Sequence, residues 1–210
     1  DDDTSGITWG KDSNLMFYEM YGTDFDDAKW QDLLDKMTLE EAQYLATFGG
    51  PSIPGVSSIG TVETYMTENA GNGVAVNLNA SKDTGAPWSI SASDPNGNWH
   101  PEVFANAPLV AASFNQDLYK EVGSFIGEEA VFTGIPILWG PGLNTHRHAS
   151  NGRNGEYYSE DPVLSGSAAM EFAMGALDYG LFAAPKHLAC NDQETYRSGA
   201  APYLPEPCAR

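Results

Sequence analysis

Two short blocks of this sequence, residues 140–166 and 184–197, contain the side chains best suited to bind or convert a ligand. Each block follows an apolar stretch, and each mixes basic with acidic groups: Arg147, Arg153 and Glu156 in the first, and Lys186, His187 and Glu194 in the second. Clustered donors and acceptors of this kind suit an uncharged ligand with many hydroxyl groups, because a hydroxyl both donates and accepts. The two blocks therefore point to sugar chemistry.

Arg153 and the pair Lys186–His187 are the sharpest candidates for ligand binding. A guanidinium group is a planar fork of donors that can bind two neighbouring sugar hydroxyls, although Arg153 could instead pair with Glu156 or Glu160 in its own loop. Adjacent side chains on a regular strand point to opposite faces. Lys186 and His187 can therefore enter one pocket only if the strand end is distorted, and the alternative is a surface lysine beside a core histidine.

The acidic side chains do not single out a catalytic pair. Hydrolysis of a glycosidic bond with retention of configuration needs two carboxylates about 5–5.5 Å apart. Spacing alone does not select such a pair from the candidates Glu156, Glu160, Asp161, Asp192 and Glu194. Ser159 or Asp161 is expected to cap the helix that begins near Pro162.

No metal or cofactor is expected from this sequence. His146 and His148 have the spacing of a metal-binding pair, but no carboxylate falls at ligand spacing from them. The stretch GPGLN after an apolar run lacks the third glycine and the immediate helix of a dinucleotide-binding loop, so we interpret it as a turn.

The composition argues against charged polymers and membranes as partners. The chain has 29 acidic and 10 basic residues, a formal net charge of −19, and a hydrophobic fraction of 41% that is ordinary for a globular protein. Phosphate groups and anionic lipids both require clustered lysine and arginine, so neither nucleic acid nor a membrane surface is expected to bind. No apolar run approaches the roughly 18 residues that a membrane-spanning helix needs.

The hydrophobic pattern after residue 107 predicts alternating strands and helices. Strands are predicted at 108–114, 135–144 and 181–189, and helices at 115–134 and 159–180. Apolar strands that alternate with helices indicate a parallel sheet. A barrel of β/α units fits because the polar blocks follow the carboxyl ends of strands, where such barrels build their sites, and a doubly wound sheet is the alternative.

The first hundred residues are less regular. Residues 1–30 are acidic and are predicted to form a lead-in or linker. A helical pattern runs from Trp30 to about residue 48, with a capping box at Thr38 and Glu41 and a stop at 49–51. Residues 51–102 are rich in Gly, Ser, Asn, Pro and Asp, and so long a stretch of loop usually forms functional surface.

The two blocks together resemble the family 3 glycoside hydrolases of the β-glucosidase type. The similarity is clear from about Asn115 to Arg197 and fainter from Trp30. The resemblance implies a (β/α)8 barrel packed on an α/β sandwich domain, with the site between them. It implies that Arg153, Lys186 and His187 bind the hydroxyls of the sugar at the cleavage point, and that a cis peptide joins Lys186 to His187.

Other residues follow from the resemblance with departures from the family pattern. Arg147 and Glu156 would brace the first block, and Arg147 is a lesser candidate for binding the substrate. Members of the family carry an Asp-Gly-Pro-x-Gly block whose Asp binds sugar hydroxyls. The corresponding residues 66–74 contain neither Asp nor Pro, so Glu68 or Asn69 is expected to stand in.

The resemblance also implies that the residues that cleave the glycosidic bond lie outside the two blocks. The nucleophile of the family lies in a Ser-Asp-Trp-like block downstream of the Lys-His pair, and the sandwich domain supplies the acid/base. Neither can be assigned in this sequence, so we expect residues 31–210 to form the first half of a TIM-like α/β barrel that a further segment or companion chain closes.

The expected function is part of a retaining, exo-acting β-glycosidase. It would hydrolyse terminal β-linked glucose-like residues of a β-glucoside or oligosaccharide, with both catalytic carboxylates outside this chain. The alternative is a non-catalytic sugar-binding or structural relative that has lost activity, which the altered residues 66–74 favour.

Overall fold

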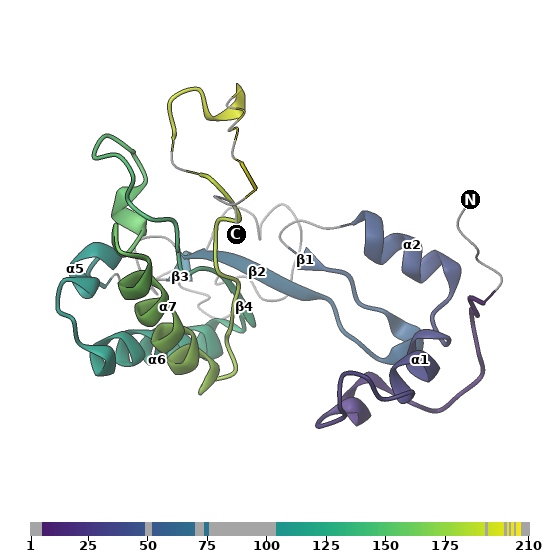
Figure 1. The fold of residues 1–210 in the computed structure, drawn as a ribbon. Coiled ribbons are helices and arrows are strands. Elements are labelled where there is room, and N and C mark those ends of the chain that lie inside the picture. The colour runs from purple at the N-terminus through teal and green to yellow at the C-terminus, as the bar shows by residue number, and fades with distance from the viewer. Residues whose placement is uncertain are drawn as a thin grey trace, which may run out of the picture. The chain divides into compact units, whose positions relative to one another are not determined.

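A computed structural model describes the chain in two compact units, Asp1–Tyr65 and Met66–Arg210, whose relative positions are not determined (Figure 1). The residues described are 6–48, 52–69, 74–75, 104–191, 193–199, 201, 203 and 205–206. The helix stop predicted at 49–51 and the candidate carboxylate Asp192 lie outside them. The boundary predicted between residues 30 and 31 stays a prediction.

The first unit holds short helices around a small core. Its elements are η1 (Phe17–Met20), α1 (Lys29–Leu34), α2 (Leu39–Thr47), β1 (Ser52–Ile53) and η2 (Ser57–Ile59). The core consists of Met20, Leu33, Met37, Val56 and Ile59. The helical pattern from Trp30 to about residue 48 consists of two helices, because the extended backbone of Thr38, the predicted N-cap, separates α1 from α2.

The capping box at the start of α2 is confirmed. The Glu41 backbone N–H donates to Thr38 Oγ1 at 3.1 Å, and Thr38 N–H donates to Glu41 Oε2 at 2.9 Å. The other carboxylate oxygen accepts from the Ser57 hydroxyl at 3.0 Å and from Ser58 N–H at 2.9 Å. Glu41 thus fixes the first turn of α2 to η2.

We expect the first unit to lose stability in acid through Glu41. Burial would raise the pKa of Glu41, but its hydrogen bonds with Thr38, Ser57 and Ser58 outweigh this and lower the pKa to about 2. A carboxyl group with a depressed pKa in the folded state stabilises it above the unfolded value, here 4.5, and loses this contribution as pH falls toward 2.

The measurement is hydrogen exchange of the α2 amides in the wild type and in Glu41→Gln. The variant should cost about 1–2 kcal/mol of local stability at neutral pH, and the difference should shrink below pH 4.5. Glu40→Gln, at the exposed neighbouring position, is the matched control. A difference between wild type and Glu41→Gln that does not depend on pH would contradict the assignment.

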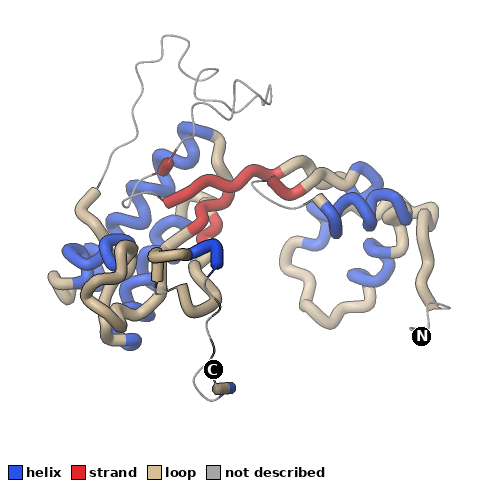
Figure 2. The backbone as a smooth tube through the Cα atoms, turned by 90° about the horizontal axis from the view of Figure 1, so that it is seen from above, coloured by secondary structure: helices blue, strands red, loops and turns tan. Residues whose placement is uncertain are grey.

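The second unit is built on a parallel sheet, as predicted. Strand β2 (Thr64–Asn69) pairs in parallel with β4 (Ile137–Trp139), which pairs in parallel with β5 (Phe182–Ala183). The short β3 (Val74–Ala75) adds to β2 in antiparallel fashion. Helices occupy both crossovers, so β2, β4 and β5 are successive strands of β/α units (Figure 2).

The strand predicted at 108–114 is wrong. This segment contains helix α5 (Ala107–Ala111), whose N-cap Asn106 accepts from Leu109 N–H and which has Pro108 in its first turn. A short apolar run fits a buried helix as well as a strand, and the capping signal decides between them. The strand that pairs with β4 on this side is β2, which was not predicted.

The two long predicted helices are confirmed as α6 (Gln116–Thr133) and α7 (Pro162–Leu177), which lie side by side (Figure 1). Asp161 caps α7. The helices approach so closely that a Cβ on Gly123 would lie 2.0 Å from the Phe172 carbonyl oxygen, and one on Gly175 would lie 2.1 Å from that of Lys120. Among the described residues, no helix is both long and apolar enough to cross a membrane.

The core of the second unit joins these helices to the sheet. Ile126 of α6, Leu138 of β4 and Phe172 of α7 are its central members, and each is at most 1% exposed. Because α6 and α7 pack on the sheet through this core, they fix where β4 and β5 end. The loops that follow these strands therefore start from rigid positions.

Candidate functional site

The candidate site lies at the carboxyl ends of the three parallel strands. Glu68 is near the end of β2, residues 140–157 follow β4, and residues 184–197 follow β5. Gly142 bridges the last two segments, because it pairs with both Tyr157 and Lys186 in isolated β-bridges. A Cβ at Gly142 would lie 2.7 Å from the Tyr157 ring, so a glycine is required at this crossing.

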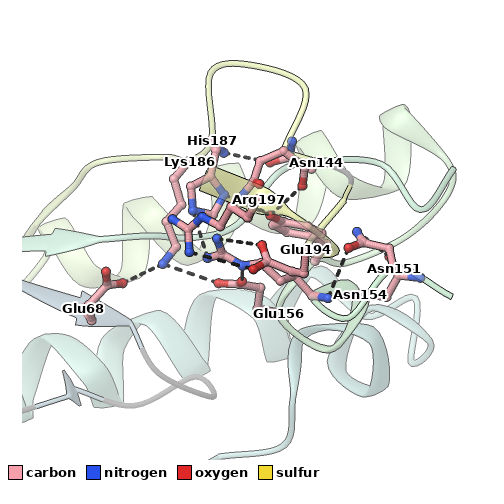
Figure 3. Close-up of polar contacts among 12 residues, drawn as sticks. Glu68, Asn144, Asn151, Asn154, Glu156, Lys186, His187, Glu194 and Arg197 are labelled. Atoms are coloured by element: carbon pink, nitrogen blue, oxygen red, sulfur yellow. Dashed lines mark hydrogen bonds and ion pairs between the residues drawn. The ribbon is translucent and has the colours of Figure 1, made fainter. Parts of the chain in front are cut away.

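Lys186 is held between two carboxylates. Its ammonium group donates to Glu68 Oε2 at 2.7 Å and lies 3.4 Å from Glu156 Oε2 (Figure 3). The Lys186 side chain is only 13% exposed, whereas that of Glu68 is 53% exposed. The peptide bond between Lys186 and His187 is cis, which confirms the expectation from the resemblance.

Arg153 connects the two loops. Its Nε donates to Glu156 Oε1 in its own loop, its Nη2 lies 3.0 Å from His187 Nε2, and its Nη1 lies 3.5 Å from Glu194 Oε1. The pairing with Glu156, one of the alternatives for Arg153, is therefore present. The guanidinium group also reaches the second loop, so it belongs to the cluster around Lys186.

His187 is fixed on three sides. Its backbone N–H donates to Asn144 Oδ1 at 2.7 Å, and its ring nitrogens meet Arg153 and the Tyr157 hydroxyl, each at 3.0 Å. The two rings of Tyr157 and His187 meet edge to face, with centroids 5.9 Å apart. Asn191 closes the arrangement, because its backbone carbonyl lies 3.2 Å from the Tyr157 hydroxyl.

The charges of the cluster shift two pKa values. Burial would raise the pKa of Glu156, but the hydrogen bond from Arg153 and the charge of Lys186 outweigh it and lower the pKa. Burial lowers the pKa of His187, and the positive charges of Arg153 and Lys186 lower it further. At neutral pH the cluster therefore holds an ionised Glu156 and a neutral His187.

The described part of the chain contains no group of three or more His, Cys, Asp or Glu side chains that could hold a metal ion. His146, one of the two histidines with metal-binding spacing, instead donates from Nε2 to the Tyr157 carbonyl oxygen at 2.7 Å. This bond fixes the loop that carries Arg153.

Four of the predicted binding residues come together, namely Glu68, Arg153, Lys186 and His187. Of the other two, Arg147 is exposed on the loop after β4, and Asn69 is the last residue of β2, where it pairs with Val74. Three further residues of the cluster were not predicted from the sequence, namely Asn144, Tyr157 and Asn191, which contact His187 or one another. Each lies inside one of the two blocks, so their positions offered a signal, but their contacts depend on the fold.

Residues 92–207 match the family described as the glycosyl hydrolase family 3 N terminal domain. The chain belongs to glycoside hydrolase family 3. A β-glucosidase of Bacteroides ovatus is 34% identical over 172 residues, which are 81% of this chain and 22% of that protein. An exo-α-(1→6)-L-arabinopyranosidase of Bifidobacterium longum is 34% identical over 164 residues, 77% of this chain and 20% of that protein.

Solved structures agree with the family. The structure of β-glucosidase 3B from Thermotoga neapolitana in complex with glucose is 30% identical and has a TM-score of 0.64, covering 79% of this chain and 24% of that one. The parallel strands with their helices are thus an incomplete TIM-barrel-like α/β fold, as predicted. The chain spans about a fifth of the length of the curated relatives from Bacteroides and Bifidobacterium.

Proposed function

We propose that this chain is the sugar-holding part of a retaining, exo-acting β-glycosidase that hydrolyses terminal β-linked glucose-like residues. The observation that carries the proposal is the contact of 2.7 Å between Lys186 Nζ and Glu68 Oε2, with Glu156 Oε2 at 3.4 Å from the same nitrogen. Alternating donors and acceptors suit hydroxyl groups, because each hydroxyl donates one hydrogen bond and accepts others.

In this proposal Lys186 and Arg153 donate to the hydroxyls of the ring at the cleavage point, and Glu68 accepts from one of them. Arg153 Nη1 is the guanidinium nitrogen that makes no hydrogen bond to a described residue, and a hydroxyl would reach it when Glu194 turns aside. His187 would hold the guanidinium through Nε2, and the contact of His187 itself with the sugar stays a prediction from the resemblance. Arg147 and Asn69 remain sequence predictions.

The absence of the family's Asp-Gly-Pro-x-Gly block favoured a non-catalytic relative. Glu68 offers a carboxylate from this same stretch, and its contact with Lys186 supports its role as the stand-in for the missing Asp. We therefore propose an enzyme, and a non-catalytic sugar-binding protein is the alternative.

In this proposal, the carboxylates that cleave the glycosidic bond lie outside this chain. Residues 31–210 would form the first part of the barrel after an acidic lead-in at 1–30, and the nucleophile and acid/base would lie in the rest of the barrel and a sandwich domain, on the same or a companion chain. This is supported by the small share of each relative that the chain spans. Binding energy from the ring hydroxyls would then position the bond for carboxylates supplied elsewhere.

The test is an assay of the full-length protein that contains this chain. We expect it to hydrolyse an aryl β-glucoside, with the β-anomer of glucose as the first product by NMR, as retention requires. An aryl α-L-arabinopyranoside should be assayed beside it, because one of the relatives is an arabinopyranosidase. Glucose binding without turnover of either substrate would replace the enzyme with the non-catalytic alternative.

A further inference from the structure

The hydrogen bonds around His187 determine which ring nitrogen carries its proton. Arg153 Nη2 lies 3.0 Å from His187 Nε2. A guanidinium group has only donors and stays protonated in proteins, so Nε2 must be the acceptor of this bond. A neutral histidine has one N–H, which therefore sits on Nδ1.

The Tyr157 hydroxyl is both an acceptor and a donor of hydrogen bonds in this cluster. The Tyr157 hydroxyl lies 3.0 Å from His187 Nδ1 and 3.2 Å from the Asn191 carbonyl oxygen. The Tyr157 hydroxyl oxygen accepts a hydrogen bond from His187 Nδ1–H, and its O–H donates a hydrogen bond to the Asn191 carbonyl oxygen. Burial raises the pKa of Tyr157 to about 12, so the hydroxyl keeps this proton at neutral pH.

Hydrogen bonds are donated in turn by Arg153 to His187, by His187 to Tyr157 and by Tyr157 to the Asn191 carbonyl oxygen, and the Asn191 side-chain amide also donates to the Tyr157 hydroxyl oxygen at 3.4 Å. In the opposite tautomer His187 Nε2–H would point at a guanidinium that can only donate, and Arg153 would lose this partner. Tyr157 is 0% exposed and His187 is half-buried, so the removal of the Tyr157 hydroxyl would take away the acceptor of the Nδ1 proton where water has little access.

We propose that Tyr157 is a positioning residue of the sugar site, which holds His187 in the Nδ1-protonated tautomer and thereby orients the guanidinium of Arg153 toward the sugar hydroxyls. This inference rests on the proposed function, since it assigns Arg153 to the substrate. This positioning role differs from a packing role, because it depends on the hydroxyl group of Tyr157 and not on its ring.

The test is Tyr157→Phe in the full-length protein, with 15N labelling of histidine. NMR should show wild-type His187 protonated on Nδ1, with its signals identified by their absence in His187→Asn. In Tyr157→Phe the proton should move toward Nε2, and the inhibition constant of glucose should rise about tenfold, the equivalent of one lost hydrogen bond in the site.

Tyr158→Phe is the matched control, because Tyr158 is the adjacent tyrosine and is 3% exposed. It should change neither the tautomer nor glucose binding. Wild-type His187 protonated on Nε2 would overturn the proposal, and this measurement needs no variant to fold. An unchanged tautomer or unchanged glucose binding in Tyr157→Phe would overturn it as well.

The two hypotheses fail separately. If the wild type binds glucose but hydrolyses no glycoside, the enzymatic function fails, while tautomer and glucose affinity still decide the role of Tyr157. If the wild type hydrolyses the β-glucoside and Tyr157→Phe binds glucose as tightly, only the positioning role fails.

Discussion

Lys186→Ala in the full-length protein should reduce kcat/KM for an aryl β-glucoside by about 100-fold or more, because a hydrogen bond to a charged group is worth about 1.5–3 kcal/mol and Lys186 also holds Glu68, the proposed acceptor from the sugar. The side chain is 13% exposed and already lies between Glu68 and Glu156, so it is held before any sugar arrives. The measurement is steady-state kinetics beside a thermal unfolding curve.

Lys120→Ala is the matched control for this prediction. Lys120 is an exposed lysine of the same unit that pairs with Asp178 at 3.1 Å on the surface. Exposed pairs of this kind contribute about 0–1 kcal/mol, and the control should keep wild-type kinetics. Wild-type kinetics in Lys186→Ala would remove Lys186 from the sugar site.

Arg153→Ala should damage both stability and sugar binding. The substitution removes the cation that Glu156 and Glu194 share, and their side chains are only 23% and 31% exposed. Lys186 at 3.4 Å from Glu156 and Arg197 at 3.9 Å from Glu194 remain as partners, so the loss should cost about 1–3 kcal/mol of unfolding free energy, and glucose binding should fall below detection. Chemical denaturation and calorimetric titration with glucose measure the two effects.

Arg153→Lys separates charge from geometry. It restores a cation beside Glu156, so it should recover much of the stability, but an ammonium group cannot reproduce the fork that reaches Glu156 and His187 together. Glucose binding should therefore stay weak. Arg197→Lys, at an exposed arginine of the loop after β5 that pairs with Glu194 at 3.9 Å, is the control and should change stability by less than about 0.5 kcal/mol. Full glucose binding in Arg153→Lys would contradict the role of the fork.

The fold could be predicted where periodicity and caps agree. Helix α6 has a long amphipathic pattern and α7 a long, mostly apolar one, Asn115 and Asp161 are their caps, and both were found within a few residues of their ends. The segment 108–114 is short and uniformly apolar, so its pattern did not separate a strand from α5. Strand β2 was hidden because its residues are largely polar, and its pairing with β1, β3 and β4 depends on the fold.

The site could be predicted only in part. Arg153, Lys186 and His187 stand out in the sequence because of their types and their motif. Their partners do not, because a tyrosine or an asparagine in a loop has many uses, and Tyr157 acquires its role only when the loop after β5 brings His187 to its hydroxyl. The contact of Glu68 with Lys186 was likewise out of reach, since the two residues are 118 positions apart.

That separation of 118 residues has a consequence for engineering. A peptide that carried either loop alone would hold only part of the cluster, because the acceptor comes from β2 and the donor from beyond β5. Closing so long a segment of chain costs conformational entropy, which the sheet and the α6–α7 pair must offset before the two groups meet. A protein designer who wished to transplant this cluster would have to move the three strands and both crossovers together, and glucose affinity would then test whether the proposed binding site had assembled.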